Sequence, residues 1–115
     1  MSAFQVQSAF LPGDLVHVRV AGPIDATAYD AFRGEFERLL DGNRCRFVVD
    51  LTGVEYIGSA AVTVLTSALG TAQQRGGNVV IAGISEPVKQ VFDILSLGSV
   101  FLVTDSLESA RACFA

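Results

Sequence analysis

Two short runs of β-branched and aromatic residues constrain the fold of this chain more than any other feature. They are Phe47-Val48-Val49 and Val79-Val80-Ile81. A strand without polar alternation is typical of a sheet buried on both faces, and such strands are usually parallel and joined by helices. The sequence therefore predicts an α/β fold with parallel strands at its centre.

The segment before the first run predicts a hairpin. Valines alternate with polar residues from Val16 to Val20, which is the period of a strand with one solvated face, and His17 should lie on that face. A Pro-Gly-Asp turn at residues 12–14 separates this strand from an earlier one at residues 4–11.

Four helices follow from the spacing of apolar residues. We expect Asp25 to be the N-cap of the first helix, and the second helix to run from Ser59 to about Gln74. The third helix should open at Ser85-Glu86-Pro87 with Leu95 on its inward face. After a last strand at residues 100–103, Ser106 should cap a terminal helix.

The predicted order is β-β-α-β-α-β-α-β-α, a mixed sheet of about five strands with four helices. We expect four strands at the core of one sheet, with the second and third helices side by side. A chain of 115 residues without a linker or repeat indicates a single domain over residues 1–115.

Composition and charge exclude several function classes. The formal net charge is −4 and the basic residues are scattered, so a nucleic-acid surface is not expected. No apolar run approaches the roughly 20 residues that span a bilayer, and no basic leader precedes one. We therefore expect a soluble cytoplasmic protein without membrane insertion.

Candidate catalytic and metal-ligating residues are few. Cys45 and Cys113 lie far apart, outside any Cys-x-x-Cys or Cys/His spacing, so we expect two buried free thiols rather than a metal site. Asp25 and Asp50 lack a nearby nucleophile, base or metal cluster, and we expect them to form local hydrogen bonds. The sequence thus predicts no catalytic or metal-binding residues, no cofactor and no enzyme activity.

The residues from Phe47 to Ile57 (Phe-Val-Val-Asp-Leu-Thr-Gly-Val-Glu-Tyr-Ile) resemble the central signature of STAS domains of the anti-sigma factor antagonist family. The order of predicted elements is also the STAS order. The resemblance implies a protein that binds a serine kinase-like anti-sigma factor in a partner-switching pathway regulating transcription. In such pathways the kinase can phosphorylate a hydroxyl at the start of the second helix, and the complex then dissociates.

The chain departs from the family at that phosphorylation motif, where it reads Gly58-Ser59-Ala60-Ala61. The match puts Ser59 on the first hydroxyl position and Ala60, which has no hydroxyl, on the acceptor position. The aspartate of the motif is replaced by Gly58. Ser59 is the remaining phosphorylation candidate, although an ordinary N-cap role is the preferred interpretation and does not exclude phosphorylation, and Thr63 is a weaker candidate one helical turn on.

The second helix contains no charged residue, which is unusual for a surface helix. A neutral face of small residues indicates a docking surface, although deeper coverage by neighbouring elements would also explain it. The predicted partner-binding residues are Asp25, Gly58, Ser59, Ala60, Ala61, Val62, Thr63 and Thr66.

Two further hypotheses remain open. The chain could be a STAS scaffold without a phosphorylation switch, such as a stressosome-like component or the soluble partner of a lipid-transport ATPase. A weak homodimer is the self-association that we expect.

Overall fold

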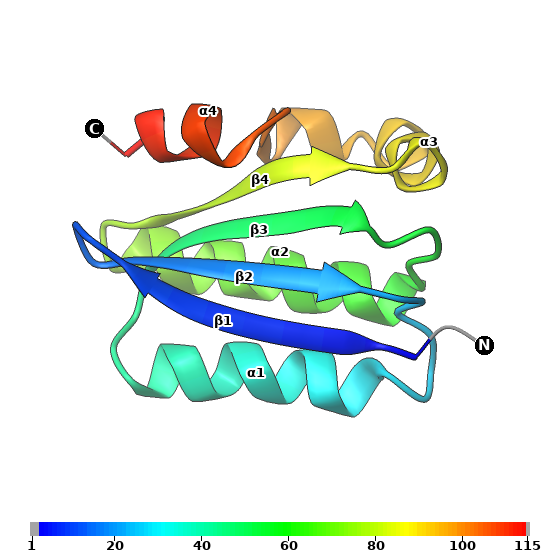
Figure 1. Ribbon diagram of the computed structural model, residues 1–115, viewed down its shortest axis with the longest axis horizontal. Helices are drawn as coiled ribbons and strands as arrows, with labels where there is room; N and C mark the ends of the chain where they lie inside the picture. The colour runs from blue at the N-terminus through cyan, green and yellow to red at the C-terminus, as the bar shows by residue number, and fades with distance from the viewer. Residues whose placement is uncertain (1–2, 115) are drawn as a thin grey trace.

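A computed structural model describes residues 3–114 and contains one five-stranded sheet with strand order β1-β2-β3-β4-β5 (Figure 1). The first two strands pair antiparallel and the other neighbours pair parallel, which confirms the predicted mixed α/β fold and its order of elements. The strands are β1 (Gln5–Leu11), β2 (Leu15–Ala21), β3 (Arg46–Gly53), β4 (Asn78–Ile84) and β5 (Leu102–Thr104). The helices are α1 (Tyr29–Asp41), α2 (Ser59–Gln74), α3 (Glu86–Ile94), the 3-10 turn η1 (Leu97–Ser99) and α4 (Leu107–Ala112).

The main core lies between one face of the sheet and helices α1 and α2. Phe32 and Phe36 of α1 stack edge to face with ring centroids 5.3 Å apart, and Phe36 contacts Phe47 of β3 at 5.8 Å. All three rings are buried, so aromatic packing fixes α1 against the centre of the sheet. On the other face, Ala110 of α4 closes a smaller cluster with Val48 and Val80.

Helix α2 packs beside α1, so the prediction that the second and third helices are neighbours is wrong. Helix α3 has 9 residues against 16 in α2, and at about 1.5 Å per residue it is too short to run back along the strands. Figure 1 shows α3 almost end-on beyond β4, while α2 runs along the sheet. The hydroxyl of Ser85, the N-cap of α3, donates to the carbonyl oxygen of Val54 in the β3–α2 connection.

Three local expectations also need correction. Asp25 caps the turn that precedes α1, because its carboxylate accepts hydrogen bonds from the amides of Thr27 and Ala28 while the helix starts at Tyr29. Leu95 is 49% exposed because α3 ends one residue earlier and Leu95 is its C-cap. The last strand starts at Leu102, after the η1 turn, instead of at residue 100.

Two burial expectations differ from the structure as well. His17 is half-buried, and burial lowers the pKa of its imidazole, so it does not lie on a fully solvated face. Both cysteines are free, but Cys113 is exposed and Cys45 half-buried. The reason for Cys113 is its position at the C-cap of a six-residue helix, beyond the buried Ala110.

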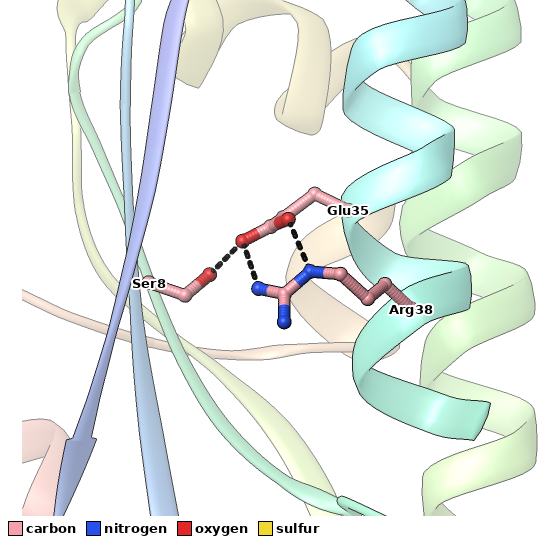
Figure 2. A network of polar contacts seen from close by, with 3 residues as sticks. All are labelled: Ser8, Glu35 and Arg38. Carbon is pink, nitrogen blue, oxygen red and sulfur yellow. Dashed lines mark hydrogen bonds and ion pairs between the residues drawn. The ribbon is translucent and has the colours of Figure 1, made fainter. Parts of the chain in front are cut away.

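A polar network ties the first strand to the first helix (Figure 2). The carboxylate of Glu35 in α1 accepts hydrogen bonds from Nε and Nη2 of Arg38, at 3.0 and 2.9 Å, and from the hydroxyl of Ser8 in β1. The bonds from Arg38 are the main reason why the pKa of Glu35 is lowered. An ionised Glu35 therefore links the edge strand β1 to α1.

Candidate functional site

The start of α2 has an unusual cap. Gly58 is the N-cap, with extended backbone angles (φ −79°, ψ 161°), and its carbonyl oxygen accepts from the amides of Ala61 and Val62 at 3.1 and 3.2 Å. Ser59 is therefore the first residue of the helix and not its cap, which corrects the expectation above. The amides of Ser59 and Ala60 have no acceptor among residues 3–114, so this end of the helix offers two free donors.

Two hydrogen bonds bring the β2–α1 loop beside this helix start. The amide of Ile24 donates to the carbonyl oxygen of Tyr56, and the amide of Gly58 donates to that of Ile24, both at 2.9 Å. Ile24 and Ile57 also form an isolated parallel bridge. The structure thus joins the segment that carries Asp25 to the segment that carries Gly58, although the two lie far apart in the sequence.

The carboxylate of Asp25 is already occupied by its own loop. It accepts from the hydroxyl of Thr27 at 2.6 Å, from the Thr27 amide at 3.0 Å and from the Ala28 amide at 3.1 Å. The bond from the Thr27 hydroxyl is the main reason why the pKa of Asp25 is lowered. Asp25 is therefore an ionised group that fixes the shape of the loop next to Gly58.

The predicted partner-binding residues fall into two groups. Ala61 and Val62 are buried, at 2% and 8% exposure, so their side chains belong to the core. The others reach the surface: Ser59, Ala60 and Thr63 are exposed, and Gly58, Thr66 and Asp25 are half-buried.

The hydroxyl groups near the start of α2 differ in their hydrogen bonding. Oγ1 of Thr63 donates to the carbonyl oxygen of Ser59 at 3.2 Å, and Oγ1 of Thr66 donates to that of Thr63 at 3.1 Å. The Ser59 hydroxyl takes part in none of the side-chain hydrogen bonds found near this helix start within residues 3–114. Of these three hydroxyl groups, that of Ser59 is therefore the one that is not hydrogen-bonded to the helix backbone.

Burial accounts for part of the neutral composition of α2. Seven of its sixteen residues are buried, because α2 packs against the sheet and against α1. Its exposed positions nevertheless form a stripe of small uncharged residues that includes Ala60, Thr63 and Ser67. A groove of about 180 Å³ separates this stripe from Tyr29 and Arg33 of α1.

Sequence reasoning did not single out Tyr56 as a site residue. Tyr56 lies three residues before the start of α2 and is 56% exposed. Together with Pro23 and Glu55 it lines a hollow of about 380 Å³. Exposed tyrosines are enriched in protein interfaces. The sequence feature that could have indicated Tyr56 is an aromatic residue in the loop that leads to the uncharged start of a helix.

Asp50, at the same end of the sheet, shows the local role expected of it. Its Oδ1 accepts from the amide of Thr52 at 2.9 Å.

Within residues 3–114 no group of three or more His, Cys, Asp and Glu side chains could hold a metal ion. In the same range no helix is both long and apolar enough to cross a membrane.

Comparison with known proteins gives consistent matches. A family model for the STAS domain matches residues 6–110. BtrV of Bordetella bronchiseptica, which carries the name of an anti-sigma factor antagonist, is 29% identical over 93 residues, 81% of this chain and 80% of its own length.

Two solved structures show the same fold. An anti-sigma factor antagonist from Mycobacterium paratuberculosis superposes with a TM-score of 0.83 at 20% identity, covering 97% of this chain and 94% of that one. The phosphorylated form of the Bacillus cell fate determinant SpoIIAA gives a TM-score of 0.72 at 16% identity, covering 96% and 99%.

Proposed function

Since the chain belongs to the STAS domain family, we propose that it is an anti-sigma factor antagonist. It binds a kinase-type anti-sigma factor in a partner-switching pathway that regulates transcription. The observation that carries this proposal is the uncharged, exposed start of α2, which the Gly58–Ile24 hydrogen bond holds beside the Asp25 loop. The names of a curated relative and of a structural neighbour support it.

The chemistry of this surface favours docking. Ser59, Ala60 and Thr63 present no charge, so covering them does not desolvate an ionised group. The free amides of Ser59 and Ala60 can each donate to an acceptor on the partner. Tyr56 adds a large amphipathic ring at the margin. We therefore include Tyr56 with the six surface residues in the docking surface.

The proposed protein binds its partner without the usual phosphorylation step. Ala60 stands on the acceptor position and has no hydroxyl, and Gly58 replaces the aspartate of the motif. If a kinase modifies the chain at all, Ser59 is the acceptor, because its hydroxyl is exposed and free while that of Thr63 is bonded to the helix backbone. SpoIIAA, a structural neighbour, exists in a phosphorylated form, so the same fold tolerates a phosphate.

The second candidate function is a STAS scaffold outside any sigma-factor pathway, in a stressosome-like assembly or as the soluble partner of a lipid-transport ATPase. The missing hydroxyl at residue 60 favours it, because a scaffold needs no switch. For either function we propose a cytoplasmic protein without catalytic activity.

The deciding experiment is affinity capture from the native organism, with identification by mass spectrometry and calorimetric titration of the purified partner. Capture of a kinase-type anti-sigma factor supports the proposal, whereas capture of transporter or stressosome subunits supports the scaffold. Incubation with the captured kinase and ATP should leave the mass of the wild-type chain unchanged. The matched Ala60→Ser variant should gain one phosphate, and an added phosphate on Ser59 of the wild type would contradict the absence of a switch.

A further inference from the structure

Exposed apolar side chains concentrate near the end of the chain. In the part of the chain that the structure describes, five of the seven exposed large hydrophobic residues lie between residues 94 and 103. Residues 94–104 include no charged side chain. The five are Ile94, Leu95, Val100, Leu102 and Val103, with exposed fractions of 80, 49, 47, 51 and 40%. A segment with this many exposed aliphatic side chains is a candidate for contact with another chain.

This apolar segment includes an open edge of the sheet. Strand β5 pairs in parallel with β4, and within residues 3–114 it has no strand on its other side. The rings of Phe92 and Phe101 lie 6.0 Å apart and are both buried, which holds the end of α3 beside β5. An unpaired edge whose side chains are aliphatic and exposed is a template for the addition of another strand.

The opposite edge of the sheet is better protected. Strand β1 carries the exposed polar residues Gln5 and Gln7, and its exposed Phe10 is covered on one side by the guanidinium of Arg44, 4.3 Å from the ring centroid. A cation over an aromatic ring at an edge discourages pairing with another chain. The two edges therefore differ: β1 is longer (7 residues against 3) but polar and partly covered, whereas the side chains of β5 are aliphatic and exposed.

We propose that β5 pairs antiparallel with β5 of a second copy, about a two-fold axis at Val103. In this register Val103 faces Val103 of the second copy, and Leu102 faces Thr104. Asp105, the charged residue that follows the strand, comes opposite the apolar Phe101 and not opposite its own equivalent. The pairing thus continues the sheet across the axis without placing like charges against each other.

The size of the surface sets the strength of this dimer. Five aliphatic side chains, each 40–80% exposed, present at most an area on the order of 500 Å² per copy, or about 1,000 Å² for the pair, because Leu102 and Val103 point to opposite faces of the sheet. Stable dimers bury about 1,200 Å² or more, and smaller interfaces belong to transient complexes. The dimer should therefore be weak, with a dissociation constant on the order of 10–1,000 µM. This surface is separate from the docking surface at the start of α2, so the two proposals can fail independently.

Sedimentation velocity over a concentration series from about 10 µM to 1 mM tests the dimer directly. The wild type should pass from monomer to dimer, and Leu102→Lys should weaken association at least tenfold, because lysine at a strand edge blocks pairing. The matched control is Phe10→Ser, at the opposite edge, which should leave the dissociation constant unchanged. A wild type that stays monomeric throughout, or a dimer lost in Phe10→Ser but kept in Leu102→Lys, would overturn the proposal.

Cysteine cross-linking tests the register. In a Cys113→Ser background, Val103→Cys places two thiols across the axis, within the Cβ separation that antiparallel neighbours and disulfides allow. Oxidised glutathione should convert this variant to a covalent dimer. The yield of covalent dimer should be much lower for the Val100→Cys control, because residue 100 lies outside the strand. Equal cross-linking of the two, or none at residue 103, would contradict the two-fold pairing, and thermal melts check that each variant is folded.

Discussion

The amide of Gly58 donates a hydrogen bond to the carbonyl oxygen of Ile24 at 2.9 Å, and this bond joins two loops that leave neighbouring strands. It sets the start of α2 beside the loop that Asp25 shapes. Both loops follow the carboxyl ends of parallel strands, where α/β proteins commonly place their binding sites. The proposed docking surface would therefore depend on the backbone of Gly58 as much as on any side chain.

The absence of a side-chain cap at Gly58 means that substitutions there should change the stability of the protein. Gly58→Asp should stabilise the protein by a few tenths of a kcal/mol, because aspartate is a better N-cap than glycine and its charge suits the helix dipole. Gly58→Ala should destabilise it by roughly 0.5–1 kcal/mol, since alanine is a poor cap. Urea denaturation measures both variants. A Cβ at position 58 would lie 3.4 Å from the carbonyl oxygen of Ile24. An equal loss of stability in the two variants would mean that this close contact has a larger effect than capping.

A charge placed on the docking surface should weaken partner binding. Ser59→Asp should keep the fold, yet the unpaired carboxylate would be desolvated in the complex, which lowers affinity on the order of tenfold to a thousandfold. Thr63→Glu should act similarly, while Arg111→Glu on α4 should barely change affinity. Calorimetric titration against the captured partner gives the three values. Unchanged affinity of both α2 variants, with intact melting curves, would place docking elsewhere.

The network around Glu35 predicts a pH dependence of stability. Glu35→Gln should cost about 1–2 kcal/mol at neutral pH, because the charged acceptor of Arg38 and Ser8 is lost. The pKa of Glu35 is lower in the folded than in the unfolded chain. Its contribution is therefore present above the unfolded pKa of about 4.3 and is lost as the pH falls through the lowered folded pKa.

The measurement is urea denaturation of the wild type and Glu35→Gln at several pH values. The difference between them should shrink toward zero in the acid range. Glu37→Gln is the matched control, since its carboxylate is exposed and pairs with the exposed Arg33 at 3.5 Å, and it should cost less than about 0.5 kcal/mol. If the difference in free energy of unfolding stays constant with pH, the loss of stability in Glu35→Gln has a steric cause and not an electrostatic one.

Two glycines should respond to alanine in opposite directions. Gly83 in β4 has φ +123°, and a Cβ there would lie 2.6 Å from Oγ1 of Thr52, so Gly83→Ala should cost about 2 kcal/mol or more. Gly70 in α2 has open space around it, so Gly70→Ala should gain about 0.5–1 kcal/mol. Thermal and urea denaturation compare the pair, and a neutral Gly83→Ala would mean that β4 shifts locally to admit the methyl group.

The sequence determined the features of this protein that depend on neighbouring residues. The limits of α2 at Ser59 and Gln74, the opening of α3 at Ser85-Glu86-Pro87 and the N-cap Ser106 all agree with the structure. Periodicity and capping act over a few residues, so the chain itself encodes them. The order of strands and helices follows from the same local patterns, and with it the α/β fold.

Only the tertiary structure decided which surfaces meet. The pairing of α2 with α1, the contact of Gly58 with Ile24 and the burial of Ala61 and Val62 depend on segments that are distant in sequence. Likewise, Leu95 has an apolar side chain but is exposed, because the length of α3 turns it away from the core. Hydrophobicity is not directional, so the sequence marks which side chains should be buried, while packing geometry decides which of them stay at the surface and are free to bind a partner.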